Sequence, residues 1–528
     1  MYHHNHSNNN NNHNSSNSNS IKMDDINTSK IGLPTIWAIG VGSALGGDFF
    51  GWQFVLYGGF LSGLGAVIFS GIFYWLYANA ITELAARYRT SGGSFAFVEI
   101  ALGKRSAAVM AVFGILKLVL ANSALALAIS SYLIEVIGGM RTRYQFLCWV
   151  LTYGIFTLLD IVGVRQAASA QVAATGLCVL VLVVFSASCL SNFSLRVVRE
   201  GGLIQDGMLG FMKSLPFALQ FFDGFEEVPL LMSYALDPEV TIPKAVVLSY
   251  VTVAMIAIMV MVSAAGESTS TELLESKAPL MNGIDKLYGA DSAFSNIIAA
   301  MIVVGLLVNF FAFVLFISQQ VQAIAEAGQL PSILAYRHPT IGSPIVASIC
   351  SSIVGIALTL GFVLVFGEEA AQNVLVTAAL MPAVLGYLVI LEAIVKVRTI
   401  ESRQFYEKLS PRDMLRLGYD PGPLRFVWGA VGARLAQIMC ILLVVALLVL
   451  AFCTADFMYG LLVLGIFGVI VYGLMYYYIR LNKDARGKHE ILSQLDDDDD
   501  SLKSPYGSKM ASLPYSEILD IPPKENRI

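Results

Sequence analysis

The sequence predicts an all-α membrane protein with about twelve transmembrane helices. Of its 528 residues, 56% are hydrophobic and only 13% are charged, whereas a soluble globular protein carries about 25% charged residues. From Leu33 onward, apolar segments of roughly twenty residues follow one another. Each is long enough to cross a hydrocarbon core of about 30 Å as a helix, so lipid is the expected solvent for most of the chain.

Glycines, prolines and clusters of charge divide the longer apolar runs into separate helices. Several runs, among them 245–266 and 435–455, contain no charged residue. Because only helices and closed barrels satisfy their backbone groups inside lipid, each run is expected to be helical. The predicted spans are 34–57, 59–86, 106–138, 145–164, 168–190, 210–235, 243–265, 291–325, 342–366, 371–396, 430–453 and 456–480.

Composition also divides the chain into regions. The N-terminal segment is almost entirely Asn, Ser and His, and the C-terminal segment contains the acidic run Asp496–Asp500. Neither offers enough apolar surface to offset the entropy of ordering, so both are predicted to be disordered. The expected regions are a tail (1–30), a core of helices one to ten (31–396), a loop (397–426), helices eleven and twelve (427–480) and an acidic tail (481–528).

Basic residues predict the orientation, because Arg and Lys near helix ends are retained on the cytoplasmic side. The segments after the second, tenth and last spans are the most basic, with Arg87, Lys396 and Arg480 among their residues. All three lie on one side if both termini are cytoplasmic. We therefore expect a multi-pass integral protein, in the plasma membrane, with both termini in the cytoplasm.

Composition argues against several classes of function. The formal net charge is −5 without a basic patch, so no nucleic acid partner is expected. The six cysteines lie inside apolar stretches without paired spacing, and the six histidines lie outside them, so no metal site or cofactor is predicted. The sequence contains no zinc-ligand pair, nucleophile elbow or phosphate-binding loop, so it does not predict an enzyme.

The first span contains a segment that disfavours helix. Gly40-Val-Gly42-Ser43-Ala-Leu-Gly46-Gly47-Asp48 places four glycines and a carboxylate within nine residues, and each glycine weakens a helix by roughly 1 kcal/mol relative to alanine. We expect the helix to unwind here and to present free amides to a substrate carboxylate. The alternative is that the glycines permit close helix packing.

The sixth span contains a second such segment, from Phe222 to Pro229, with three carboxylates, Gly224 and a proline. Proline blocks a helical turn, and the freed carbonyl groups suit an ammonium group or a cation. The alternative is a span that ends before Asp223, with the acids in water. Breaks in spans one and six have the spacing of two five-helix inverted repeats, which would bring them together near the membrane midplane.

Lys117 is a charged residue within the apolar part of the third predicted span. An ionisable residue within a membrane helix is expected to face a cavity or to pair with a carboxylate. The alternative is a side chain that reaches the membrane interface along its apolar stem.

Several motifs resemble the amino acid–polyamine–organocation transporter superfamily. They include the glycine-rich segment from Gly40 and the stretches Glu83–Arg87, Ser91–Phe97, Ala101–Gly103, Phe222–Glu226, Asp237–Pro238, Ile242–Ala245, Ala327–Pro331 and Gly342–Pro344. The segments Gly47–Trp52 and Pro216–Ala218 resemble the ethanolamine-permease-like branch. Cys178 stands where some proton-coupled members have a lysine. The resemblance implies a leucine-transporter-like fold with helices one and six broken.

This resemblance implies a secondary active permease that moves an amino acid by alternating access. In that hypothesis Gly40, Gly42 and Ser43 bind the carboxylate, and the carbonyls of Phe222 and Gly224 bind the amine. Glu226 and Asp48 would balance the amine charge or bind a coupling proton. The expected partners are a small amine-bearing substrate and the lipid bilayer, with H⁺ or Na⁺ as coupling ion. The alternatives are an ethanolamine or polyamine transporter and a non-transporting nutrient receptor.

Overall fold

The computed structural model is almost entirely helical, as predicted. It describes residues 30–49, 51–137, 144–275, 279–289, 292–339, 341–408 and 429–499. Within these ranges the single β pairing is an isolated parallel bridge between Ile31 and Ala235. The chain divides into two units, residues 1–476 and 477–528, and the helix bundle described below belongs to the first.

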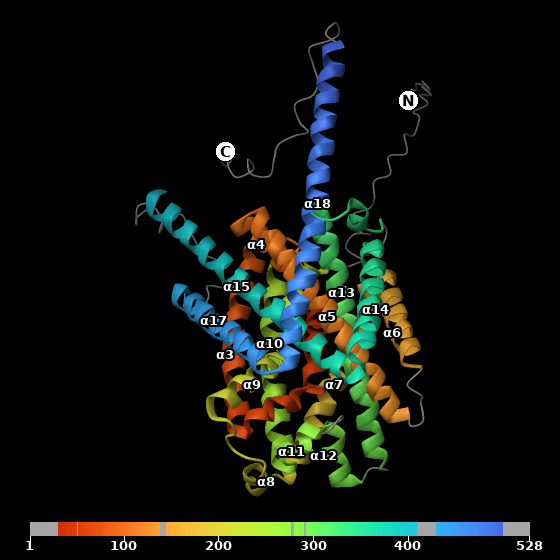
Figure 1. The fold of residues 1–528 in the computed structure, drawn as a ribbon, viewed down its shortest axis with the longest axis vertical. Coiled ribbons are helices and arrows are strands. Elements are labelled where there is room, and N and C mark those ends of the chain that lie inside the picture. Colours follow the sequence, from red (N-terminus) through yellow and green to blue (C-terminus); the bar gives the residue numbers. More distant parts are fainter. Residues whose placement is uncertain are drawn as a thin grey trace, which may run out of the picture. The chain divides into compact units, whose positions relative to one another are not determined.

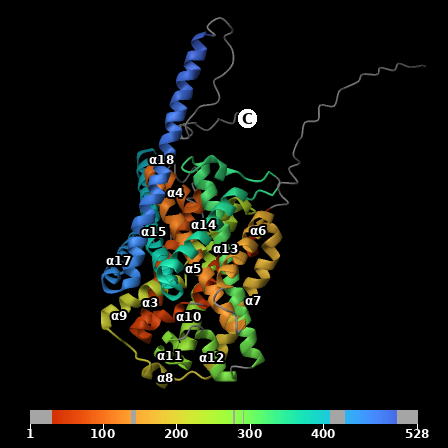
Figure 2. The same ribbon diagram turned by 45° about the vertical axis from the view of Figure 1, so that its right-hand side comes forward.

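Ten helices in the described ranges are long and apolar enough to cross a membrane (Figures 1 and 2). They are α3 (Phe60–Arg87), α5 (Lys104–Ile137), α6 (Gln145–Val162), α7 (Val164–Ser191), α10 (Pro238–Glu267), α13 (Ala293–Glu326), α14 (Ile345–Phe366), α15 (Glu368–Lys408), α17 (Gly429–Cys453) and α18 (Ala455–Asp499). The remaining two predicted spans, the first and the sixth, are each divided into two shorter segments.

The sixth span is interrupted at the predicted residues. Helix α9 (Gly207–Gln220) ends in a turn at 221–224, after which a 3₁₀ helix, η3 (Phe225–Tyr234), continues. Gly224 has φ +123°, a conformation that side chains strongly disfavour. The glycine therefore allows the chain to turn there, and Pro229 lies inside η3 rather than in an α-helix.

The first span is also divided, but not at the predicted residues. Helix α2 (Leu33–Phe49) continues through Gly40, Gly42, Ser43 and Asp48, and η1 (Trp52–Gly58) follows Gly51, which has φ +88°. The predicted unwinding within the glycine-rich segment is therefore wrong. The first span is interrupted between Phe49 and Trp52, after the glycine-rich segment has ended.

Contacts with other helices explain why the glycine-rich segment stays helical. A Cβ atom on Gly40 would lie 2.5 Å from the Ser249 hydroxyl, and one on Gly47 would meet the backbone of Gln220. Side chains also donate hydrogen bonds to the carbonyls of this helix, including Thr175 to Ala38 at 3.1 Å. The alternative considered for these glycines, close helix packing, is the one that the structure supports.

Short helices cover the two ends of the bundle. Helix α4 (Gly93–Leu102) lies near one end, and α8 (Leu195–Glu200), α11 (Ser270–Glu275) and α12 (Pro279–Tyr288) lie at the other (Figures 1 and 2). A further 3₁₀ helix, η4 (Ser332–Ala335), follows α13. The Lys286 ammonium of α12 donates a hydrogen bond to Glu272 of α11 at 2.7 Å and lowers the pKa of that carboxyl group.

Two helices extend beyond their predicted ends. Helix α15 continues to Lys408, into the predicted loop 397–426, and α18 continues to Asp499, into the predicted tail 481–528. Lys, Arg, Glu and Gln are good helix formers, so a helix can outlast its apolar part. The predicted tail 1–30 falls almost wholly outside the described residues.

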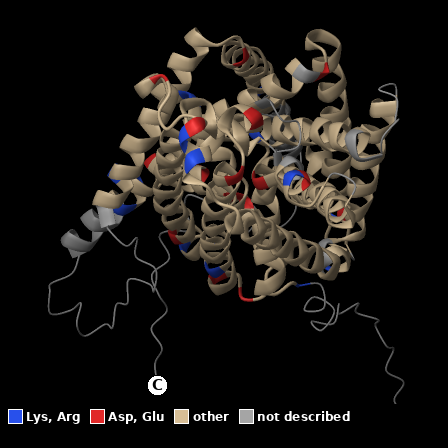
Figure 3. Ribbon diagram, turned by 90° about the horizontal axis from the view of Figure 1, so that it is seen from below, with Lys and Arg blue, Asp and Glu red and all other residues tan. Residues whose placement is uncertain are grey.

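Burial separates a central group of helices from an outer group. In the most apolar 18-residue stretch of each helix, 78% of the residues are buried in α5 and α15 and 72% in α13. In α14 and α18 only 22% are buried. Charged residues occupy few positions on the ribbon, which is otherwise tan in Figure 3. The outer helices thus present apolar side chains outward, as lipid contact requires.

We predict that Gly47→Ala destabilises the protein by about 1–3 kcal/mol, because the added methyl group would overlap the Gln220 backbone. The measurement is the unfolding transition of the purified protein in detergent. Gly361→Ala in α14 is the matched control, since nothing lies within 4 Å of its Cβ position. Equal destabilisation by the two substitutions would contradict the packing role of Gly47.

Candidate functional site

The turn of the sixth span packs directly against helix α2. A Cβ atom on Gly224 would lie 2.5 Å from the Ser43 carbonyl oxygen, so only glycine fits at this contact. Further along α2, Gly47 lies against the backbone carbonyl of Gln220, the last residue of α9. The two divided spans therefore meet, although α2 contributes its helical part rather than an unwound one.

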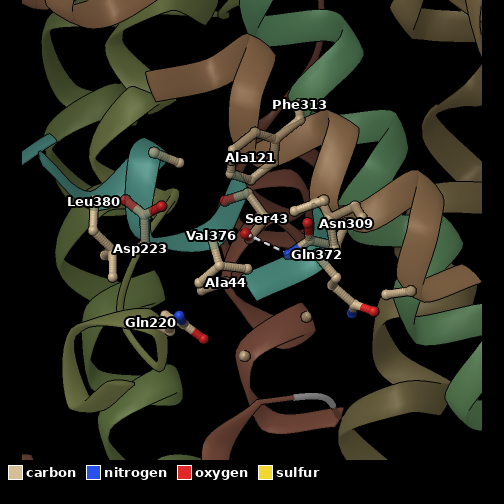
Figure 4. A pocket seen from close by; sticks show the side chains of 16 residues that line it. Ser43, Ala44, Ala121, Gln220, Asp223, Asn309, Phe313, Gln372, Val376 and Leu380 are labelled. Atoms are coloured by element: carbon tan, nitrogen blue, oxygen red, sulfur yellow. Dashed lines mark hydrogen bonds between the residues drawn. The ribbon is translucent and has the colours of Figure 1, made fainter. Parts of the chain in front are cut away.

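A small cavity of about 90 Å³ lies at this junction (Figure 4). Its wall is mostly small and apolar, and Asp223 is the one charged residue among the described residues that line it. The lining residues are Ser43, Ala44, Gly46, Gly47, Ala121, Ala124, Leu125, Ala128, Gln220, Asp223, Asn309, Phe313, Gln372, Val376, Ala379 and Leu380. They come from α2, α5, α9 and the following turn, α13 and α15.

Several polar groups in the cavity wall have unused hydrogen-bonding capacity. Asn309 donates to the Ser43 carbonyl at 2.6 Å, shown as the dashed line in Figure 4. Its own carbonyl oxygen, and the amide nitrogens of Gln220 and Gln372, have no hydrogen-bond partner among the described residues. A buried polar group without a partner costs about 1–3 kcal/mol, so the wall favours a ligand that supplies complementary atoms.

Behind Asp223 lies a buried ion cluster centred on Lys117 of α5. The lysine nitrogen is 3.0 Å from Asp223, 2.5 Å from Glu226 and 2.9 Å from Glu227. The side chains of Lys117 and Glu226 are only 3% and 1% exposed, whereas Asp223 is 17% exposed. Asp223 therefore belongs both to the cluster and to the cavity.

Tyrosine hydroxyls and a backbone amide complete this cluster. The Tyr387 hydroxyl lies 2.9 Å from Asp223 and 2.6 Å from Glu226. Tyr74 lies 3.0 Å from the Tyr387 oxygen. The Gly224 N–H donates to the other oxygen of Glu226 at 2.8 Å. The turn thus positions Glu226 through its own backbone, and α3 and α15 contribute the two hydroxyl groups.

The cluster contains more acid than base. One lysine faces three carboxyl groups, so with all four groups ionised the cluster carries two more negative than positive charges. Burying uncompensated charge in a medium of low polarity is costly. The cluster is therefore suited to accept further positive charge, either as protons on the carboxyl groups or as a cation at Asp223, which reaches the cavity.

The structure places the predicted residues of the sixth span together. Glu226 and Gly224 lie in the cluster, and the ring of Phe222 stacks on Tyr74 with a centroid separation of 5.4 Å. Asp223, which the prediction omitted as a binding residue, is the one that lines the cavity. The alternative of a span that ends before Asp223, with the acids in water, is wrong because Glu226 and Glu227 are buried.

The predicted residues of the first span are arranged differently. Gly40 and Gly42 lie inside α2, where their amides take part in the helical hydrogen bonding, so they are not free for a carboxylate. Ser43 lines the cavity. Asp48 is fully buried outside the cavity wall, and no described residue forms a hydrogen bond with its carboxylate. A role of these four residues in substrate binding stays a prediction.

Sequence reasoning identified Lys117 without its partners. The prediction that Lys117 pairs with a carboxylate is confirmed. The alternative, in which its ammonium group reaches the membrane interface, is wrong because the side chain is buried. Asn309 and Gln372 were missed, although an amide side chain within an apolar span is a usable signal for an internal site. Tyr387 gave no signal, since tyrosine is common in such helices and its partners lie in another span.

Comparison with known proteins supports a transport family. The family model described as amino acid permease matches residues 31–484. An uncharacterized transporter of Rhizobium meliloti is 22% identical over 375 residues, which cover 68% of this chain and 76% of the relative. An uncharacterized transporter of Legionella pneumophila is 23% identical over 361 residues, which cover 64% of this chain and 76% of that relative.

We predict that Lys117→Met destabilises the protein by about 3–5 kcal/mol, because it leaves three carboxyl groups without a cation. Unfolding in detergent is the measurement. Lys286→Met is the matched control: it removes an exposed ion pair with Glu272 and should cost at most about 1 kcal/mol. Adding Glu227→Gln to Lys117→Met should restore part of the loss. Equal stability of the two single variants would contradict the role of Lys117.

Proposed function

This chain belongs to the amino acid permease family, and we propose that it carries a small amino acid across the membrane by alternating access. It is an integral multi-pass membrane transporter of this family. The observation on which the substrate proposal depends is the position of Asp223, a carboxylate at the wall of a small cavity where the two divided spans meet.

The ammonium group of the substrate would bind at Asp223. One oxygen of this carboxylate already contacts Lys117 and Tyr387. A substrate ammonium on the cavity side would add positive charge to a cluster in which one lysine faces three carboxyl groups. Charge-assisted hydrogen bonds of this type contribute about 1.5–3 kcal/mol, so this contact would supply a large share of the affinity for a small ligand.

The other end of the substrate would meet neutral donors. The amide nitrogens of Gln220 and Gln372 lack partners among the described residues and suit carboxylate oxygens. The remaining wall consists mostly of small residues such as Ala121, Ala124 and Gly46. Together with a volume of about 90 Å³, this wall favours an amino acid with a small side chain.

Alternating access would use the breaks as hinges. Gly51 follows the C-terminal end of α2, Gly224 lies in the turn after α9, and both have positive φ. Hinges in proteins are usually a few residues of this kind, in loops or at the ends of helices. At one end of the bundle, Arg398 of α15 pairs with Glu83 of α3. Arg337 donates to Gln322 of α13 at 2.6 Å. These contacts would have to separate when that end opens.

A specific observation favours a second candidate, an amine without a carboxylate, such as ethanolamine or a polyamine. Among the described residues no cationic side chain lines the cavity, and the amides of α2 are engaged in its helix. A substrate carboxylate would therefore meet only neutral donors, whereas an additional cation would reduce the surplus negative charge. The small volume favours a short amine over a long one.

We expect the purified wild-type protein in liposomes to accumulate labelled alanine under a proton or sodium gradient. Asp223→Asn should weaken substrate affinity about tenfold to a hundredfold, because it replaces a charged acceptor by a neutral amide. Glu200→Gln is the control, since Glu200 is exposed and pairs only with exposed Arg196. Unchanged affinity in Asp223→Asn would contradict the proposed ammonium site.

Competition distinguishes the candidates. If glycine and alanine displace the label and ethanolamine does not, the amino acid is the substrate. If ethanolamine or putrescine displaces it and glycine does not, the second candidate replaces the first. Binding without flux under every gradient would instead indicate a receptor and would contradict transport.

A further inference from the structure

We propose that a second, larger cavity is a binding site for organic cations, distinct from the cavity at Asp223. It has a volume of about 290 Å³, three times that of the inner cavity, and is lined by η1, α9, α15 and the connection from α17 to α18. Its wall combines aromatic rings with one carboxylate that lacks a partner.

Four aromatic residues form a continuous part of this wall. The ring of Phe54 lies 5.6 Å from that of Tyr57 and 5.2 Å from that of Phe217, between ring centroids. Phe217 in turn lies 6.3 Å from Phe457 at the start of α18. Aromatic faces attract cations, most strongly where water is excluded. Such a wall therefore suits an ammonium group that carries apolar substituents.

The charged groups of this cavity leave an uncompensated negative charge. Lys213 lines it, but its ammonium group is neutralised by Asp206 at 2.8 Å. The carboxylate of Asp456, which also lines it, has no ion pair or hydrogen bond with a described side chain; only its backbone carbonyl is bonded, by Thr377. Asp456 lies in the first turn of α18, at the edge of the cavity wall.

The ligand class follows from these two features. A quaternary ammonium or an aromatic amine places its cation between Asp456 and the rings and fills a volume that the inner cavity does not offer. Gln220 and Val376 line both cavities, so the two are separated by few side chains. A cation in the larger cavity would therefore lie next to the inner cavity and would hinder access of a substrate to it from this side.

The test uses the full-length protein in detergent with benzyltrimethylammonium as the probe. Binding is measured by isothermal titration calorimetry and by the ligand-dependent rise in melting temperature. The wild type should bind the probe, and Asp223→Asn should bind it with the same affinity, because Asp223 is not among the residues that line the larger cavity. Glu200→Gln serves as the matched control for removing one carboxylate and should also retain binding.

Asp456→Asn should weaken probe binding at least tenfold, as expected for loss of the single uncompensated charge. Tyr57→Leu should weaken probe binding several-fold, because it removes one aromatic ring from the wall. Tyr57 is 42% exposed, so this substitution should leave the packing of the core unchanged. In liposomes the probe should inhibit substrate uptake by the wild type more strongly than by Asp456→Asn.

Two outcomes would overturn the site: no binding of the probe to the wild type, or binding that Asp223→Asn abolishes and Asp456→Asn leaves unchanged. The result is independent of whether alanine or ethanolamine is carried, because the probe assay needs no substrate. Failure of the inner-site experiments and failure of this one are therefore distinguishable.

Discussion

The ion pairing of Lys117 with three carboxyl groups is the interaction on which the centre of this structure depends. It joins α5 to the turn and to η3, so a helix without a break holds the broken span in position. Tyr387 and Tyr74 extend the contact to α15 and α3. A buried charge without a partner is costly. Neither α5 nor the turn with η3 can therefore move away from the cluster unless another charged or polar group replaces it.

The cluster also explains the chemistry of the neighbouring cavity. Small residues on α2, α5 and α15 leave space, and Asp223 is the only member of the cluster that reaches it. A ligand at this carboxylate would share it with Lys117, which contacts one of its oxygens. Binding at the cavity and the arrangement of the buried charges are therefore linked, which is a requirement for any coupling between a substrate and a proton or cation.

The sequence predicted best those features in which a residue pattern is compatible with a single structure. Apolar length located the spans, and three acids with Gly224 located the break of span six. The glycines of span one were ambiguous, because Thr175, Ser249 and Asn309, from other helices, determine whether α2 unwinds or packs. Charged residues after α15 and α18 did not mark helix ends, since they too are good helix formers. Partners such as Lys117 and Tyr387 are separated by hundreds of residues and become neighbours only in the fold.

The parallel bridge between Ile31 and Ala235 has a mechanical consequence. The Ile31 amide donates to Tyr234 at 2.8 Å, and the Leu236 amide donates back to Ile31 at 3.0 Å. The segment that begins the first broken span is thereby fastened to the segment that ends the sixth. Because these hydrogen bonds join backbone to backbone, a displacement of either half-span would be passed to the other directly through the main chain.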